Sequence, residues 1–464
     1  MKRYRWLVLL CAVTVVAAAC GRSDDKSGSE TSTTTAASST SGSASTGAFG
    51  TSDVVCKKGS ASGSPAQGVT PTEVKIGTLA DPGFAGRPGL DQELFDTATV
   101  FAKWCNDAGG INGRKIVVNQ RDAALFNVKA RMTEACASDF MLVGGGVVFD
   151  QDGVTTRLSC LMPEIAGYAV SPQQRGSDLL IQPLPNDTKT LPIGDYKYLG
   201  KKYPDATKAY GVLTGDVDTT KIVARQADEA AQSLGWKKVY DDVYPATGAS
   251  DWTPYAQKLK DNGTKSLIWV GEPENLAKLL QALSDIGYQL DFIRTDANHY
   301  DQKLIDTAGS AVKNVYVRSA FAPFEDAKPG SPTQQYLDAF DKYLPNGKSK
   351  ALLGLQAWSA WMLFATAANE CGNDLTRKCV YDNAKKITDW TGGGLHTESD
   401  LATGKAPACF TELIASPSGF KIVSDLKPNQ GIYRCDSGNV YTLKGDYPQG
   451  ITLADVGKSM ADFK

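Results

Sequence analysis

Apolar residues follow two spacings that alternate along the chain from residue 72 onward. Glu73–Leu79 has the spacing of a strand, and Asp91–Ala108 repeats apolar residues at helical spacing before a pair of glycines. The next segments continue in the same way, with strands expected at Lys115–Asn119 and Phe140–Val143 and a helix expected at Asn127–Asp139. Strands that alternate with helices predict crossover connections and a parallel sheet.

The alternation then restarts and predicts a second sheet of the same kind. Strands are expected at Lys208–Leu213, Lys238–Tyr244, Ser266–Val270, Asp291–Thr295 and Asn314–Ser319, separated by helices at Thr219–Gly235, Tyr255–Asn262 and Asn275–Gly287. A long apolar helix, Leu352–Ala368, follows a segment at Ala320–Phe324 that is placed to return the chain to the first sheet. The fold class is therefore α/β, with two lobes. Because ligands of open α/β sheets bind beyond the carboxyl ends of the strands, the cleft between the lobes is the expected functional site.

The N-terminus has the pattern of an export signal. Basic residues at Lys2, Arg3 and Arg5 precede a short apolar run and the small residues before Cys20. The apolar run is shorter than the roughly 20 residues that a membrane-spanning helix needs. Residues 1–19 are similar to a bacterial lipoprotein signal peptide, in which the cysteine becomes the lipidated N-terminus, although Ala17 stands where such signals usually carry Leu or Val. A plain secretory signal with an incidental cysteine is the alternative.

The segment that follows predicts a spacer. Residues 20–55 are rich in Ser, Thr, Ala and Gly and contain almost no large apolar side chains. Such a composition buries too little surface to offset chain entropy, so a flexible linker between the lipid and the folded body is expected. Together, signal and spacer predict an extracytoplasmic protein that lipid on Cys20 anchors to the cell membrane.

Cysteine usage agrees with export. Eight cysteines remain after Cys20, and an even number in an oxidising compartment predicts four disulfides. Cys371 and Cys379 are expected to close a small loop, and Cys409 and Cys435 to pair within a strand-like C-terminal stretch. A zinc site is not expected, because no CxxC pair occurs.

Composition excludes several function classes. The chain has 49 Lys and Arg against 51 Asp and Glu, which gives no overall field for nucleic acid. Only two histidines are present, His299 and His396, so multi-histidine metal sites are excluded. No GxSxG or HExxH motif occurs, and the only enzymatic alternative is a carboxylate pair such as Asp216 with Glu272. Neither catalysis nor a cofactor or resident metal is expected.

Two stretches carry a resemblance to a known family. Asn106–Ile116 reads Asn-Asp-Ala-Gly-Gly-Ile-Asn-Gly-Arg-Lys-Ile, and a second stretch runs from Asp251-Trp252-Thr253 to Gly271. From residue 54 onward the chain resembles proteins of the type I periplasmic-binding-protein fold. Within that fold it resembles the branched-chain amino acid and amide subfamily of ABC-transporter substrate-binding lipoproteins.

The resemblance implies two doubly wound parallel-sheet lobes joined by crossing hinge segments. Lobe 1 would contain residues 56–187 and 322–408, and lobe 2 residues 188–321 and 409–464. In such a lobe Cys136 and Cys160 would close two helices on one face of the sheet and pair, which leaves Cys56 for Cys105. A Cys105–Cys136 bond, which would have to cross the sheet, is the alternative.

The resemblance also implies a set of ligand-binding positions at the strand ends, each of which has a structural alternative such as packing, a surface turn or a helix cap. They are Phe84, Gly146, Val147, Phe149, Tyr168, Ser171, Asp216, Glu272, Asn298 and Tyr300. Glu272 would suit a cationic group of the ligand. The loop at Gly145–Phe149 lacks the Ser or Thr with which the family often holds a carboxylate, and this departure argues against an ordinary amino-acid ligand.

The implied function is capture of a small polar metabolite, such as an amino acid, an amide or a small carboxylate, in the interlobe cleft. The implied partners are that ligand, the permease of an ABC importer, and the membrane through the N-terminal lipid alone. A monomer that does not bind nucleic acid is expected. A ligand-sensing ectodomain of the same fold is the alternative.

Overall fold

The computed structural model describes residues 47–464, and 47 is the first residue whose placement is given. The expected signal peptide at residues 1–19, the lipid-bearing Cys20 and the linker residues before 47 lie outside the described residues. Within residues 47–464 no helix combines the length and the apolar character needed to cross a membrane.

The first sheet is parallel and five-stranded, in the order β2-β1-β3-β4-β5. Its strands are β1 (Glu73–Ala80), β2 (Lys115–Asp122), β3 (Met141–Val143), β4 (Glu164–Ile165) and β5 (Leu180–Ile181). The connecting helices are α1 (Gln92–Asp107), α2 (Val128–Ser138), α3 (Gln151–Ser159) and α4 (Pro172–Arg175). The apolar positions of β1 and α1 that define the sequence pattern are buried, which explains why these elements form where they do.

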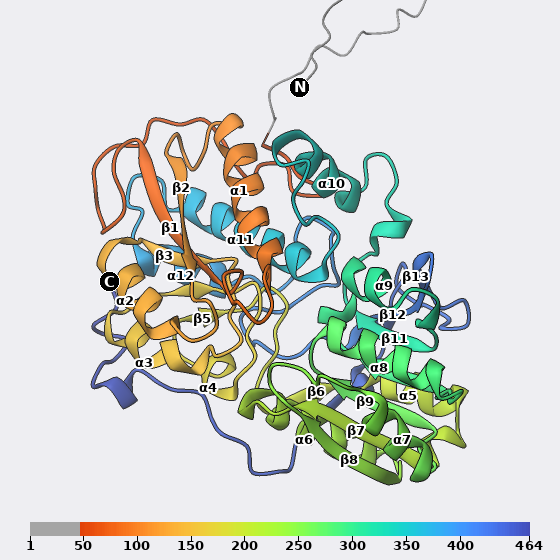
Figure 1. Ribbon diagram of the computed structural model, residues 1–464. Coiled ribbons are helices and arrows are strands. Elements are labelled where there is room, and N and C mark those ends of the chain that lie inside the picture. Colours follow the sequence, from red (N-terminus) through yellow and green to blue (C-terminus); the bar gives the residue numbers. More distant parts are fainter. Residues whose placement is uncertain (1–46) are drawn as a thin grey trace, which may run out of the picture. The chain divides into compact units, whose positions relative to one another are not determined.

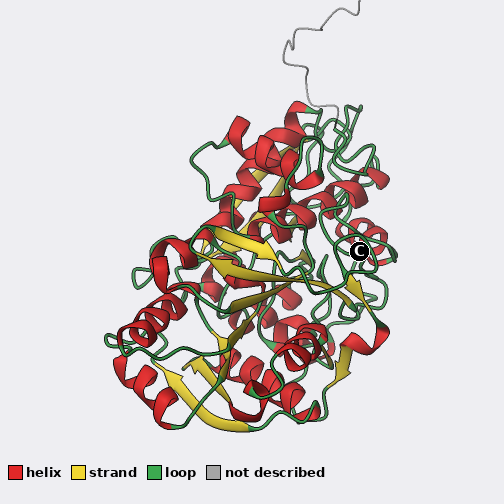
Figure 2. Cartoon of the chain, turned by 90° about the vertical axis from the view of Figure 1, so that its right-hand side faces the viewer, coloured by secondary structure: helices red, strands yellow, loops and turns green. Residues whose placement is uncertain are grey.

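The second sheet repeats the strand order of the first. Its parallel part runs β8-β7-β9-β10-β11, with β7 (Tyr210–Gly215), β8 (Lys238–Tyr244), β9 (Ser266–Val270), β10 (Phe292–Thr295) and β11 (Val315–Ser319). The helices of this part are α5 (Gly194–Lys202), α6 (Asp218–Ser233), α7 (Thr253–Asp261), α8 (Pro273–Asp285) and α9 (Gln302–Ala308). Helices lie on both sides of the strands (Figure 2). The prediction of two doubly wound parallel sheets is confirmed for these strands.

Antiparallel strands extend the second sheet beyond the predicted pattern. β12 (Cys409–Ser416) pairs antiparallel with β11, and β13 (Gly419–Ile422) and β14 (Arg434–Cys435) pair antiparallel with β12. A separate two-stranded sheet joins β6 (Thr190–Pro192) to β15 (Val440–Thr442). Short turns of 3₁₀ helix occupy Ala206–Ala209, Ala297–His299, Gly309–Ala311, Phe324–Asp326, Ser437–Asn439 and Ala454–Val456.

The chain returns to the first sheet after β11, as expected. α10 (Pro332–Tyr343), α11 (Leu352–Glu370) and α12 (Arg377–Lys385) follow, and α11 lies beside α1 (Figure 1). Phe101 of α1 packs on Trp358 and Trp361 of α11 with ring centroids 5.1 and 5.7 Å apart. The chain then goes back to the second sheet through β12.

The C-terminal end differs from the expected lobe boundary. The prediction assigns residues 409–464 to lobe 2, but Leu453 and Phe463 are buried in an apolar cluster with Val154 and Leu158 of α3. The Leu453 N–H also donates to Asp178, at 2.7 Å. The last residues therefore pack on the half of the molecule that contains the first sheet, because the apolar side chains of this tail are buried against α3.

The predicted linker also ends earlier than residue 55. Phe49 is 2% exposed and packs against Trp358, with ring centroids 5.3 Å apart. The Thr51 N–H donates to the Gly393 carbonyl at 2.9 Å. The segment directly before Cys56 thus belongs to the folded body, since its one aromatic side chain fills part of the core.

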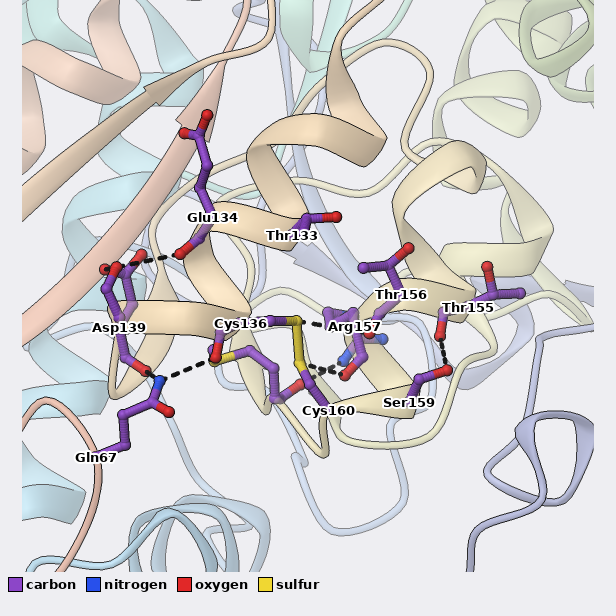
Figure 3. Close-up of a disulfide and its surroundings, with 12 residues drawn as sticks. Gln67, Thr133, Glu134, Cys136, Asp139, Thr155, Thr156, Arg157, Ser159 and Cys160 are labelled. Carbon is purple, nitrogen blue, oxygen red and sulfur yellow. Dashed lines mark hydrogen bonds between the residues drawn. A yellow bond between two sulfur atoms is a disulfide. The ribbon is translucent and has the colours of Figure 1, made fainter.

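Four disulfides join the eight described cysteines in the expected pairs: Cys56–Cys105, Cys136–Cys160, Cys371–Cys379 and Cys409–Cys435. The alternative Cys105–Cys136 bond is not formed. Figure 3 shows the bond between Cys136, on α2, and Cys160, at the end of α3. Beside it, the Gln67 side chain donates to the carbonyls of Cys136 and Asp139, at 3.0 Å each, and ties the segment before β1 to the end of α2 (Figure 3).

Candidate functional site

The strand order of each sheet reverses beside its first strand, and the loops at these two reversal points line one continuous site. In the first sheet the reversal lies between β1 and β3, and in the second between β7 and β9. Such reversals open a crevice at the carboxyl ends of the strands, where α/β proteins bind ligands. Figure 1 locates the strands from which these loops emerge.

Three adjoining cavities occupy this crevice. The outer cavity, of about 180 Å³, is lined chiefly by Phe84, Arg87, Leu90, Phe126, Val148, Phe149, Val217, Tyr244, Glu272 and Glu274. The central cavity, of about 160 Å³, is lined chiefly by Asp91, Val148, Tyr168, Val170, Val223, Trp269, Glu272, Asp296, Asn298, His299 and Leu353. The arginine cavity, of about 220 Å³, is named for Arg175, Arg294 and Arg318 in its wall.

The three cavities share walls, so one ligand can extend from one into the next. Val148 and Glu272 line both the outer and the central cavity. Tyr168, Val170 and Asp296 line both the central and the arginine cavity. The crevice is therefore a single elongated site with an apolar middle.

Arg87 connects the two halves across the outer cavity. It lies in the loop after β1, and its guanidinium forms ion pairs with Glu272, after β9, and with Glu274, the latter at 2.6 Å. The two glutamates raise the pKa of Arg87, so it stays charged. The cation that Glu272 was expected to take from a ligand is thus supplied by the protein itself.

Asp91 faces the central cavity from a strained backbone. Its φ angle is 55°, in the left-handed region that side chains other than glycine seldom adopt. The Tyr168 hydroxyl donates to the Asp91 carboxylate at 2.6 Å. Burial raises the pKa of Asp91 well above its usual range, and Glu93 and Glu272 raise it further. Residues with backbone strain of this kind cluster at functional sites, where the surrounding contacts hold them in place.

The opposite wall is polar, and the Asn298 side chain forms its hydrogen bonds within this wall. Asn298 donates to the Gly271 carbonyl at 2.9 Å, and its side-chain oxygen contacts His299 Nδ1 at 3.0 Å. Burial lowers the pKa of His299 to about 4, so the imidazole is neutral at pH 7. His299 Nε2 has no hydrogen-bond partner. A neutral ring with a free nitrogen at a cavity wall can contact a ligand without adding charge.

Buried carboxylates hold the loops that follow β3 and β4. Asp81 accepts the Val148 N–H at 2.9 Å, and Asp150 accepts the Val170 N–H at 2.6 Å. Burial raises the pKa of Asp150 to about 7. A Cβ atom on Gly146 would lie 2.4 Å from the Tyr168 ring, so only glycine lets the two loops approach this closely.

The crevice brings together only part of the residues expected from sequence. Those that line it are Phe84, Phe149, Tyr168, Glu272 and Asn298. The others do not line these cavities, and their surroundings explain why.

Val147 is buried in the core and Gly146 lies against Tyr168. Ser171 is fully buried and caps α4 by accepting the Gln174 N–H at 3.1 Å. The Tyr300 ring packs on Phe420, and its hydroxyl donates a hydrogen bond to the Glu325 carboxylate.

Asp216 is not among the residues that line the three cavities. It is exposed and forms an ion pair with Lys221 at 2.9 Å. Because Asp216 lies outside the three cavities and Glu272 pairs with Arg87, these carboxylates do not form the pair that a glycosidase mechanism requires. No group of His, Cys, Asp and Glu suited to a metal ion is found among residues 47–464.

Several lining residues were not predicted from sequence. Asp91, Trp269 and Asp296 stand at the ends or starts of predicted elements, and Asp296 directly follows β10, so position alone was an available signal. Arg318 is the penultimate residue of a predicted strand, as Trp269 is, so it carried the same positional signal, whereas Arg175 gave none.

Comparisons with known proteins agree with this architecture. The sequence profile of the family described as "Periplasmic binding protein" matches residues 189–412. The Leu/Ile/Val-binding protein homolog 1 of Brucella abortus (strain 2308) is 26% identical over 282 residues, which cover 59% of this chain and 72% of that protein.

Two solved structures are similar over most of the chain. A fatty acid ABC transporter substrate-binding protein from Thermomonospora curvata matches with a TM-score of 0.64 and 17% identity, over 81% of this chain and 97% of that one. A branched-chain amino acid transporter substrate-binding protein from Streptococcus pneumoniae, in complex with isoleucine, matches with a TM-score of 0.60 and 18% identity, over 76% and 99%. With its two sheets of like order and the crevice at their carboxyl ends, the chain has the type I periplasmic-binding-protein fold.

Proposed function

We propose that the protein is an extracytoplasmic solute-binding protein that captures a small metabolite in the interlobe crevice and delivers it to an ABC importer. Lipid on Cys20 would anchor it to the cell membrane. One observation carries the proposal: three adjoining cavities lie at the carboxyl ends of both sheets, and residues of both halves line them. The two similar proteins named above, one for fatty acids and one for branched-chain amino acids, add support.

The mechanism we propose is a shift between open and closed arrangements of the lobes. A solute that touches both halves binds the closed arrangement more tightly and therefore populates it. Arg87 contributes to the same equilibrium, because its ion pairs with Glu272 and Glu274 exist only when the halves meet. The closed pair of lobes would be the form that the permease recognises. No covalent step is involved.

A thermal-shift screen of the purified full-length chain against amino acids, amides, organic acids and fatty acids tests the proposal. A true ligand at about 100 times its Kd adds about 2.7 kcal/mol to the free energy of unfolding. We expect at least one class to raise Tm without any turnover of the compound. If no class changes Tm, or if the binder is chemically converted, the solute-binding function is wrong.

Replacement of Arg87 tests the closing contact. We expect Arg87→Met to weaken ligand binding about tenfold, because the closed arrangement loses its cross-cleft ion pairs and keeps two neighbouring glutamates unpaired. Isothermal titration calorimetry measures the change in Kd. Lys221→Met is the matched control, since it removes a cation paired with Asp216 and Asp218 within one half. Equal Kd values for the Arg87 variant and the control would show that the contact plays no part in binding.

A further inference from the structure

The wall of the arginine cavity carries more cationic than anionic side chains. Arg175, Arg294 and Arg318 line it, whereas Asp296 is the one carboxylate in its wall among the described residues. Arg294 is satisfied, because it donates to Asp195 at 2.7 Å and to both oxygens of Asp296 at 2.9 Å. Among the described residues, neither Arg175 nor Arg318 donates a hydrogen bond to a carboxylate as Arg294 does.

Arg318 has spare hydrogen-bonding capacity at the cavity wall. Its side chain is 14% exposed, and its nearest carboxylate oxygen belongs to Asp296, 3.6 Å from Nε. Its Nε and Nη1 atoms are buried and lack a hydrogen-bond partner. Asp296 is already shared with Arg294, so it neutralises Arg318 only in part. Leaving buried guanidinium donors unpaired is costly, and an incoming anion would remove that cost.

Arg175 approaches the same cavity from the first half and is paired with neutral groups. It donates to the side-chain oxygens of Asn186 at 3.1 Å and Gln226 at 2.9 Å. Arg175 is 7% exposed, and its Nε has no hydrogen-bond partner among the described residues. Burial lowers its pKa to about 10, which leaves it charged at pH 7.

The acids near these arginines, Asp150, Asp187 and Glu412, offset this charge only in part. Glu412 lies opposite Arg318 on β12 and is fully buried, and neither of its carboxylate oxygens has a hydrogen-bond partner. Burial and the nearby Asp195 raise the pKa of Glu412 well above its usual range, which favours its neutral form. Asp187 directs its carboxylate to the N–H groups of Lys189 and Thr190, at 2.6 Å each.

Among residues 47–464, every carboxylate that lines the adjoining central cavity already has a partner. Asp91 accepts the Tyr168 hydroxyl, and burial favours its neutral form. Glu272 pairs with Arg87, and Asp296 pairs with Arg294. The remaining wall is largely apolar, with Val148, Val170, Val223, Trp269 and Leu353. This wall suits a hydrocarbon body next to an anionic group.

We propose, as a refinement that rests on the solute-binding function, that the ligand is an amphipathic carboxylate without an ammonium group. Its carboxylate binds Arg318 and Arg175 in the arginine cavity, and its apolar body occupies the central cavity and extends toward Phe84 and Phe149. Arg318 sets the preference for a carboxylate, because a guanidinium can offer it two parallel N–H donors. A neutral analogue would leave those donors unpaired, and a zwitterionic analogue would leave its own ammonium group unpaired.

Isocaproate, leucine and isocaproamide form a matched ligand set for calorimetry on the full-length chain. Isocaproate is leucine without its ammonium group, and isocaproamide replaces the carboxylate with a neutral amide; octanoate and octanamide extend the set to a longer body. We expect each carboxylate to bind at least about tenfold more tightly than its amide, and isocaproate to bind at least about tenfold more tightly than leucine. Tighter binding of leucine than of isocaproate, or equal binding of acid and amide, would overturn the proposal.

Variants of Arg318 supply an independent arm. Arg318→Gln should bring the Kd of the carboxylate to within about threefold of that of the amide. Arg318→Lys should keep only part of the preference, because an ammonium group retains the charge but cannot offer two parallel N–H donors. Arg434→Gln removes an exposed arginine on β14 and should leave the preference for the carboxylate over the amide unchanged. If another class of solute binds and Arg318→Gln leaves its Kd unchanged, the carboxylate site is wrong while solute binding stands. If no compound of this set or of the wider screen binds the wild-type chain, both proposals fail.

Discussion

Arg294→Met is expected to lower the free energy of unfolding by about 3–5 kcal/mol, because it leaves the buried Asp195 carboxylate without its cation. Arg294 is 2% exposed and joins Asp195 of α5, which is fully buried, to Asp296 after β10. Loss of the guanidinium leaves Asp195 in the interior without a counter-ion and releases Asp296 from its position in the crevice wall. Urea denaturation monitored by circular dichroism measures the loss.

The matched control for this prediction is Arg131→Met. Arg131 forms an ion pair with Glu134 one helical turn away, where both side chains are more than a third exposed. Such surface pairs contribute about 0–1 kcal/mol, so this variant should unfold nearly as the wild type does. A loss below about 1 kcal/mol for Arg294→Met as well would mean that the buried network does not hold β10 and α5 together.

Phe49→Ala is expected to cost about 3–5 kcal/mol, as large-to-small changes of buried aromatic side chains do. Phe49 lies ahead of the first sheet in sequence, yet it is 2% exposed and packs between Trp104 and Trp358. The substitution would leave a cavity between α1 and α11. The shift in the denaturation midpoint at constant m-value reports the change.

Phe126→Ala makes the same chemical change at a side chain that is 69% exposed. We expect less than about 0.5 kcal/mol of lost stability there. If Phe49→Ala lowered stability equally little, the segment from residue 47 would not contribute to the core. The predicted linker boundary at residue 55 would then be supported.

The strands and helices were largely predictable because their patterns are local. β8 and β9 begin and end at the predicted residues, and most other elements differ by one to three positions. The C-terminal stretch that holds β12 and β13 was predicted to be strand-like, but its antiparallel pairing with β11 was not, since tertiary contacts rather than periodicity decide such pairing.

The predicted residues that line the crevice all stand in loops after the carboxyl ends of strands. Tyr168 and Glu272 stand in such loops and line the crevice. Ser171 and Tyr300 stand in such loops too, but a helix cap and an aromatic cluster take their side chains away from it. Arg318 is a strand residue in sequence, and nothing short of the three-dimensional arrangement shows that it faces Asp296.

The solute-binding account is tested most directly by a crystal structure of the full-length chain with the tightest binder from the screen. The account predicts ligand density in the central cavity, between Tyr168 on one half and Trp269 and His299 on the other. Density elsewhere, for example in the groove lined by Leu280, Leu283 and Tyr288 beside α8, with the central cavity left empty, would contradict it.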